Sequence, residues 1–86
     1  MRRRRGWDDA AGLDGIITFF SSHHALHAED VLKQNGIRAA LVPGPREISP
    51  NCGVALRFQW ADKDRVIRHM TEYRIQYERV ILLPVA

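Results

Sequence analysis

Apolar residues fall along the chain in short runs that predict four strands. Gly15–Phe20 is β-branched and aromatic without alternation, which is typical of a strand buried on both faces. Ile37–Val42 and Ile75–Leu83 are two further apolar runs of strand length. Val54–Phe58 alternates instead, so its side chains are predicted to divide between two faces, with Val54, Leu56 and Phe58 on one and Ala55 and Arg57 on the other.

Two segments between these runs carry helix signals. Ser21 and Ser22 are typical N-cap residues and Gly36 is a typical C-cap residue, so the first helix is predicted from about His23 to Asn35. Asp62 is the expected N-cap of the second helix. Helical periodicity gives each helix one core-facing stripe. The stripes contain His24, Ala25, Ala28, Val31 and Leu32 in the first helix, and Val66, Ile67, Met70 and Tyr73 in the second.

The resulting order, βαββαβ, predicts an α+β fold of the ferredoxin-like sandwich type. In that fold four antiparallel strands form one sheet, both helices cover one face, and the third strand lies between the first and the second. One edge of the domain then collects the end of the first strand, the start of the first helix and both ends of the loop between the second and third strands. We expect Ser21–His24, Pro43–Arg46 and Asn51–Gly53 to meet there.

Length and charge set the domain organisation. Eighty-six residues, of which 45% are hydrophobic and 27% charged, suffice for one small globular domain, and no apolar run reaches membrane-spanning length. We expect a flexible basic leader over residues 1–14 and a single domain over residues 15–86. Four of the thirteen Lys and Arg residues lie in the leader, so nucleic-acid binding is expected only weakly, through Arg2, Arg3, Arg4 and Arg5.

Cys52 is the single cysteine, which excludes an internal disulfide and suits a reducing, cytoplasmic setting. The predicted topology places it near the N-terminus of the first helix, where partial positive charge lowers a thiol pKa from about 8.5. Arg46 and protonated His23 or His24 add to this effect, while Gly53 leaves space for a reactant. The alternative, a buried packing cysteine, stays open at this point.

Other chemistry is less well supported by the sequence. His24 faces the predicted core whereas His23 and His27 turn away, so fewer than three ligands converge and no metal site is predicted. A thiol–imidazole hydrolase has no predicted pocket or orienting third group. Arg57 and Tyr77 suggest an RNA-binding sheet, but the aromatic signature of such sheets is missing. No bound cofactor is expected.

Two segments resemble a known family. Ser21–Leu26, followed by Ala28, Glu29 and Leu32, resembles the first-helix entry of the small bacterial and archaeal selenium/sulfur (Se/S) carrier protein-like family. Pro45–Phe58 is similar to that family's more specific pattern: Pro-Arg, a Ser two residues after Glu, then Cys-Gly and a strand ending Ala-Leu-Arg-Phe. The resemblance extends over about Gly15 to Leu83 and leaves out the leader.

The resemblance implies a carrier rather than a turnover enzyme, with a transient persulfide or perselenide on Cys52. Arg46, Ser49 and Gly53 match the motif around the cysteine, and Ser21, Ser22, His23 and His24 match the helix entry. The implied partners are a donor, such as a cysteine desulfurase or a selenium-delivery enzyme, and an acceptor protein. A second hypothesis is a non-catalytic regulatory or oligomerisation module, with Cys52 structural and the apolar open sheet face available for a homodimer.

Overall fold

The computed structural model describes residues 12–44 and 53–83, and the elements within these ranges follow the order βαββαβ. The predicted number and order of strands and α-helices are confirmed, and a short 3-10 helix, η1, precedes the second α-helix. The elements are β1 (Gly15–Thr18), α2 (Ser22–Gln34), β2 (Ala39–Pro43), β3 (Val54–Phe58), η1 (Trp60–Asp62), α3 (Lys63–Glu72) and β4 (Arg79–Leu82).

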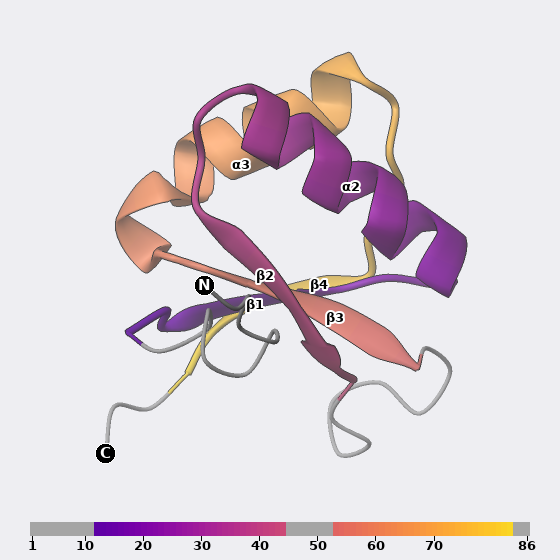
Figure 1. Cartoon of the computed structure of the whole chain (residues 1–86), viewed down its shortest axis with the longest axis horizontal. Coiled ribbons are helices and arrows are strands. Elements are labelled where there is room, and N and C mark those ends of the chain that lie inside the picture. The colour runs from indigo at the N-terminus through magenta and orange to yellow at the C-terminus, as the bar shows by residue number, and fades with distance from the viewer. Residues whose placement is uncertain (1–11, 45–52, 84–86) are drawn as a thin grey trace, which may run out of the picture.

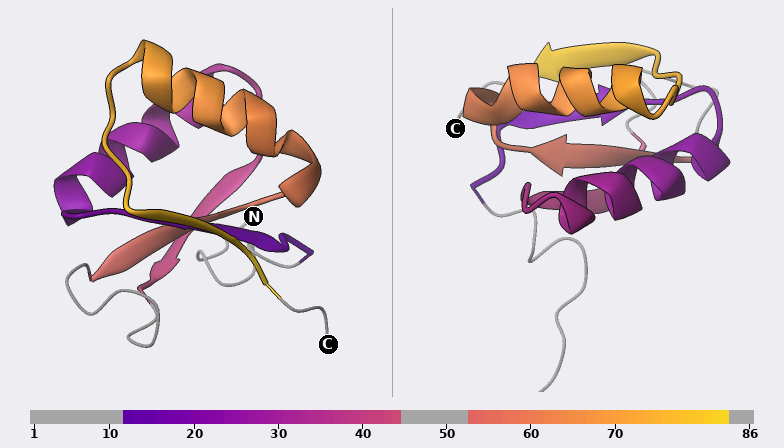
Figure 2. Two further views of the ribbon diagram at one scale, coloured as in Figure 1. Left: turned by 180° about the vertical axis from the view of Figure 1, so that it is seen from behind. Right: turned by 90° about the horizontal axis from the view of Figure 1, so that it is seen from above.

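The four strands form one antiparallel sheet in the order β2-β3-β1-β4. The third strand therefore lies between the first and the second and is antiparallel to both, as the sequence predicts. Both helices lie on the same face of this sheet (Figure 1). The view from above shows α2 over β2 and β3, and α3 over the side formed by β1 and β4 (Figure 2).

The main core lies between the sheet and the two helices, and periodicity predicts most of it. Four residues of the predicted α2 stripe are buried, whereas its fifth member, His24, is only partly buried. The predicted division of β3 is also confirmed, because its three helix-facing side chains pack into this core. The α2 and β3 residues of the core are Ala25, Ala28, Val31, Leu32, Val54, Leu56 and Phe58.

All four residues of β1 are buried, as the absence of alternation in this run predicts. Ile17 faces the helices, where it joins the main core. Gly15 lies under the Phe58 ring, where a Cβ atom would stand only 2.7 Å from Cζ of that ring. Glycine is needed here because the ring, itself stacked on Trp60, occupies the space a side chain would take.

The opposite face of the sheet has a smaller cluster, formed by Leu13 and Ala40 with Val42 packed against them. Arg57 lies on this face, and its Nε and Nη2 atoms both donate to the carbonyl oxygen of Leu13, with Nε at 3.0 Å. Arg57 therefore fastens the chain before β1 to the sheet. Leu13, which the sequence analysis placed in the leader, is only 1% exposed.

The sequence places the end of the first strand too far along the chain. The prediction extends it to Phe20, but β1 ends at Thr18 and the Phe20 side chain is 55% exposed. The reason is the helix that follows. Ser21 caps α2, so the chain has to leave the sheet before it, and Phe20 lies in the connection.

Two predictions about the second half of the domain are also wrong in detail, whereas a third, Asp62 as the N-cap residue of the second helix, is confirmed. Tyr73, expected in the core stripe, is exposed because α3 ends at Glu72 and the chain turns there. The last strand begins at Arg79 rather than Ile75, since Ile75 is used to anchor the end of α3 in the core. Asp62 occupies the N-cap position of α3, but its carboxylate pairs with Arg65 at 3.4 Å and makes no capping bond.

Neither α-helix in the described ranges has the length and apolar character needed to cross a membrane.

Candidate functional site at one end of the sheet

The strand register brings three strand ends to one end of the sheet. Thr18, the last residue of β1, pairs with Ala55 near the start of β3, and Ala55 pairs on its other side with Val42 near the end of β2. Just beyond this row, the backbone N–H of Gly44 donates to the carbonyl oxygen of Gly53 at 3.1 Å. The two residues that flank segment 45–52 are thus held together at the end of the sheet.

The first turn of α2 begins at this same end, three residues after β1. Ser21 is the N-cap in an extended conformation, and its Oγ accepts a bond from the backbone N–H of His24 at 3.5 Å. The first turn contains no acidic side chain, so none is present there to offset the partial positive charge of the helix N-terminus. Of the segments predicted to meet, the described residues Ser21–His24, Pro43–Gly44 and Gly53 therefore lie at the same end of the sheet.

Three of the predicted site residues, Arg46, Ser49 and Cys52, lie outside the described residues. Gly53, which is covalently bonded to Cys52, is described and exposed. A Cβ atom added at Gly53 would meet nothing within 4 Å, so the space on that side of Gly53 is open. This agrees with the expectation that Gly53 leaves room for an approaching reactant.

The histidines at the start of α2 differ in their surroundings. His23 and His27 are exposed, whereas His24 is partly buried against the domain. The rings of His23 and His24 have centroids 6.3 Å apart and are inclined at 60°. The Nδ1 atom of His24 is buried and has no hydrogen-bond partner. Of the two neighbouring imidazoles, only His24 is therefore held against the protein interior.

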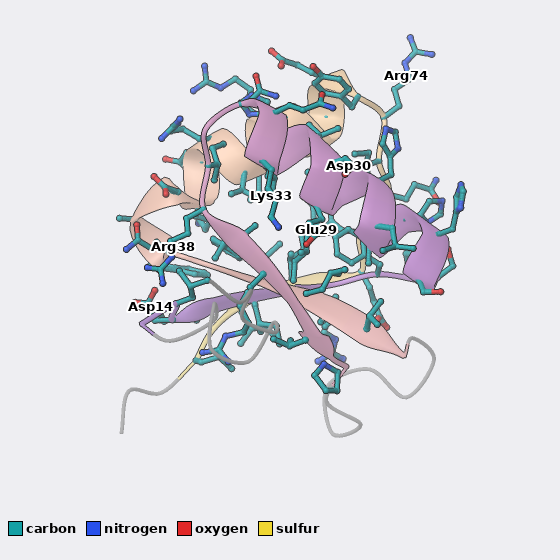
Figure 3. All side chains as sticks on the ribbon, viewed as in Figure 1. Asp14, Glu29, Asp30, Lys33, Arg38 and Arg74 are labelled. Atoms are coloured by element: carbon teal, nitrogen blue, oxygen red, sulfur yellow. The ribbon has the colours of Figure 1, made fainter. Side chains whose placement is uncertain are left out.

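No group of three or more His, Cys, Asp or Glu side chains within residues 12–44 and 53–83 is placed to hold a metal ion. Acidic side chains on α2 begin only at its second turn, where Glu29 forms an ion pair with Lys33 at 3.1 Å (Figure 3). Asp14 lies at the other end of the molecule from the first turn of α2 (Figure 3). Among the described residues, this end of the sheet therefore holds imidazoles, the backbone N–H groups of the helix N-terminus and one carboxylate, that of Glu78, whose Oε1 accepts a hydrogen bond from Thr18 Oγ1 at 3.3 Å.

Comparison with known protein families assigns the chain. A family model described as "Putative Se/S carrier protein-like" matches residues 14–82. The chain belongs to this family. The match confirms the family resemblance of the sequence and covers all the strands and helices described above, together with the segment that contains Cys52. Searches of curated proteins and of solved structures found no match.

In this member of the Se/S carrier protein-like family, the structure shows two features of the site that the sequence did not predict, an unpaired ring nitrogen and exposed apolar side chains. The unpaired Nδ1 of His24 has no signature in the sequence, because the pairing of a ring nitrogen depends on the elements packed around it. Phe20 and Leu26, which are 55% and 51% exposed, add apolar surface beside the first turns of α2. The Ser21–Ser22 capping signal, read strictly, would have removed Phe20 from the strand and found this exposed ring.

Proposed function

We propose that this protein is a sulfur or selenium carrier that accepts a persulfide or perselenide on Cys52 and passes it to a partner protein. The observation that carries the proposal is the family match over residues 14–82, which includes Cys52 and its flanking motif. The arrangement of the described residues supports it. The residues that flank segment 45–52 are bonded to each other at the sheet end where α2 begins.

The transfer chemistry needs a thiolate and an accessible approach rather than a deep pocket. The Cys52 thiolate attacks the outer sulfur of the donor's persulfide, and a bond forms between Cys52 Sγ and that sulfur. The S–S bond of the donor breaks, its electron pair stays on the donor's inner sulfur, and the donor leaves as a thiolate. Sulfur moves without net oxidation, so no bound cofactor takes part. In perselenide transfer the same bonds form and break, with selenium in place of the outer sulfur.

The fold, setting and partners of this carrier are part of the proposal. The βαββαβ order and the sheet order β2-β3-β1-β4 support a ferredoxin-like sandwich. A single thiol suits the reducing cytoplasm. The donor is a cysteine desulfurase or a selenium-delivery enzyme, and a second protein is the acceptor.

Reactivity of the native thiol tests this proposal. We expect native Cys52 to be alkylated by iodoacetamide rapidly at neutral pH, with an apparent pKa for the thiol below the usual value of about 8.5, because the positive end of α2 favours the thiolate. The measurement is the alkylation rate as a function of pH in native and in denatured protein.

A matched control moves the thiol to another exposed position. In the double variant Cys52→Ala, Thr71→Cys the thiol lies near the C-terminal end of α3, where a helix disfavours an anion. Its alkylation is expected to follow a profile whose midpoint lies at or above the ordinary cysteine value of about 8.5. A wild-type thiol that reacts only after denaturation would exclude the carrier and favour a structural cysteine in a regulatory or oligomerisation module.

A further inference from the structure

β4 is an edge strand whose outer side has no neighbour among the described residues. It stands at the end of the sheet order and pairs only with β1 (Figure 2). An edge strand presents unpaired backbone N–H and C=O groups, and an added strand can bind them. Within Arg79–Leu82 every residue except Arg79 is apolar, and the side chain of Leu82 is 49% exposed.

The hydrogen bonds between β1 and β4 fix which residues of β4 point outward. The N–H of Leu83 donates to the carbonyl oxygen of Asp14 at 2.8 Å, in continuation of the β1–β4 register. Hydrogen-bonded positions alternate along an antiparallel pair, so Ile81 also turns its backbone groups toward β1. The N–H and C=O groups of Val80 and Leu82 therefore point away from the sheet.

The other edge of the sheet, β2, differs from β4 in its row of outward groups. The N–H of Gly44 donates to the carbonyl oxygen of Gly53, so by the same alternation Pro43 occupies an outward position of β2. Proline has no N–H to donate, and it is one of the residues that protect sheet edges from pairing. β4 contains neither proline nor lysine, so its outward positions keep both of their donors.

We propose that β4 pairs with β4 of a second copy of this chain, in an antiparallel arrangement about a two-fold axis at Ile81. Val80 of each copy then lies opposite Leu82 of the other. Each of these pairs exchanges two backbone hydrogen bonds, so the outward N–H and C=O groups of both residues are satisfied on both copies. The same surface serves both copies, as in the commonest symmetric dimers.

β4 itself has the composition that this edge requires of an added strand. A strand that pairs here places side chains beside Val80, which packs against the main core, and beside Ile81 on the other face of the sheet. Its central positions must therefore be apolar. In the proposed register they are taken by Leu82, Ile81 and Val80 of the other copy, and apolar cross-strand pairs of this kind stabilise a sheet.

The charges near β4 do not oppose this pairing. Arg79 is the one charged residue of the strand, and its two copies lie four positions apart, about 13 Å along the junction. Salt at physiological concentration screens repulsion over that distance. Glu78 precedes β4 and is turned toward β1, because its N–H donates to the carbonyl oxygen of Thr18 at 2.6 Å and its Oε1 accepts a bond from Thr18 Oγ1 at 3.3 Å.

Amide hydrogen exchange in the full wild-type chain tests the pairing residue by residue. In a single chain the N–H groups of Val80 and Leu82 face water and exchange fast, whereas those of Ile81 and Leu83 are bonded to β1 and exchange slowly. In the dimer all four are expected to exchange slowly. Fast exchange at Val80 and Leu82 in wild type at about 0.5 mM, where mass action favours association, would overturn the inference.

Two variants at Leu82 are expected to separate the copies. Leu82→Lys places a charge on the edge, and Leu82→Pro removes an outward donor without touching the ladder to β1. In Leu82→Lys the N–H of Val80 is expected to exchange at least about tenfold faster than in wild type, with Ile81 unchanged.

The mass in solution, by size exclusion with light scattering, is the second readout. A reductant is present so that no intermolecular disulfide contributes. Wild type is expected at the mass of two chains and both Leu82 variants at the mass of one. Leu26→Lys is the matched control, because it changes the same residue type at 51% exposure on α2, which lies over β2 and β3, and it is expected to stay dimeric.

The other outcomes decide against a second copy. Wild type at the mass of one chain at about 0.5 mM, or a dimer that survives both Leu82 variants, would show that β4 is not the interface. Protection of Val80 and Leu82 that develops only when a cysteine desulfurase is added would show that this edge binds a strand of another protein instead.

Discussion

The residues that follow the two α-helices, Gly36 and Arg74, adopt the same backbone conformation and can be compared directly. After α2, Gly36 has φ 74° and the N–H of Ile37 donates to the carbonyl oxygen of Leu32 at 2.9 Å. After α3, Arg74 has φ 56° and the N–H of Ile75 donates to the carbonyl oxygen of Met70, also at 2.9 Å. Both are Schellman motifs closed by a buried isoleucine, but only one has the glycine that this geometry favours.

Exchanging these residues should therefore have opposite effects on stability. Arg74→Gly is expected to raise the free energy of unfolding by about 0.5–1 kcal/mol, because glycine adopts positive φ without steric cost. Gly36→Ala is expected to lower it by about 1 kcal/mol for the same reason. Thermal unfolding measures both, since 1 kcal/mol shifts the midpoint of a domain this size by roughly 4–8 °C.

Arg74 projects from the end of α3 into solvent and its side chain is free to change without disturbing the core (Figure 3). Arg74→Ala is the control, since alanine removes the side chain but keeps the cost of positive φ. A destabilised Arg74→Gly protein would show that the arginine side chain, rather than the backbone conformation, stabilises this turn.

The sequence predicts the buried faces of helices and strands better than it predicts where they end. The buried stripe of α2 and the alternation of β3 follow from periodicity, because the pattern of buried side chains repeats regularly along each element. The predictions for Phe20 and Tyr73 are wrong for a common reason. Each residue is apolar but lies just past the end of its strand or helix. Hydrophobicity alone does not show where a strand or helix ends. Cys52 is a candidate from its motif and the predicted topology and lies outside the described residues, whereas the unpaired nitrogen of His24 appears only once the elements are packed.

Asp14 joins three elements and was not singled out by the sequence analysis. Its Oδ1 accepts the backbone N–H of Trp60 at 2.8 Å, at the start of η1, where the N-cap residue Gln59 makes no side-chain capping bond. Its carbonyl oxygen accepts the N–H of Leu83 at 2.8 Å, just beyond β4. Asp14 therefore caps a helix from a distant part of the chain and helps close the sheet.

Removing this carboxylate should destabilise the domain. Asp14→Ala is expected to lower the free energy of unfolding by about 1–2 kcal/mol, the usual effect of losing an N-cap acceptor. Asp14→Asn keeps an acceptor oxygen and should lose less. Urea denaturation measures both, with Asp30→Ala on the exposed face of α2 as the control. Equal stabilities for wild type and Asp14→Ala would show that the capping bond contributes nothing in solution.

In the molecule as a whole, the two ends of the sheet hold different groups of residues. One end, with Asp14, Arg57 and Trp60, is closed by hydrogen bonds between segments distant in the chain. The other end holds the residues flanking segment 45–52, the first turn of α2, and exposed apolar side chains. The hydrogen bonds between distant segments therefore lie at the opposite end from the residues that flank Cys52, an arrangement that suits the carrier function proposed above.

The most direct test of the carrier function is the mass of the chain after incubation with a cysteine desulfurase and free cysteine. We predict that wild type gains the mass of one sulfur atom, that a reductant removes it, and that Cys52→Ala, folded with an unchanged thermal midpoint, gains none. If wild type gains no sulfur while the same donor loads another acceptor thiol, or if Cys52→Ala gains as much as wild type, the account of this protein as a carrier through Cys52 is wrong.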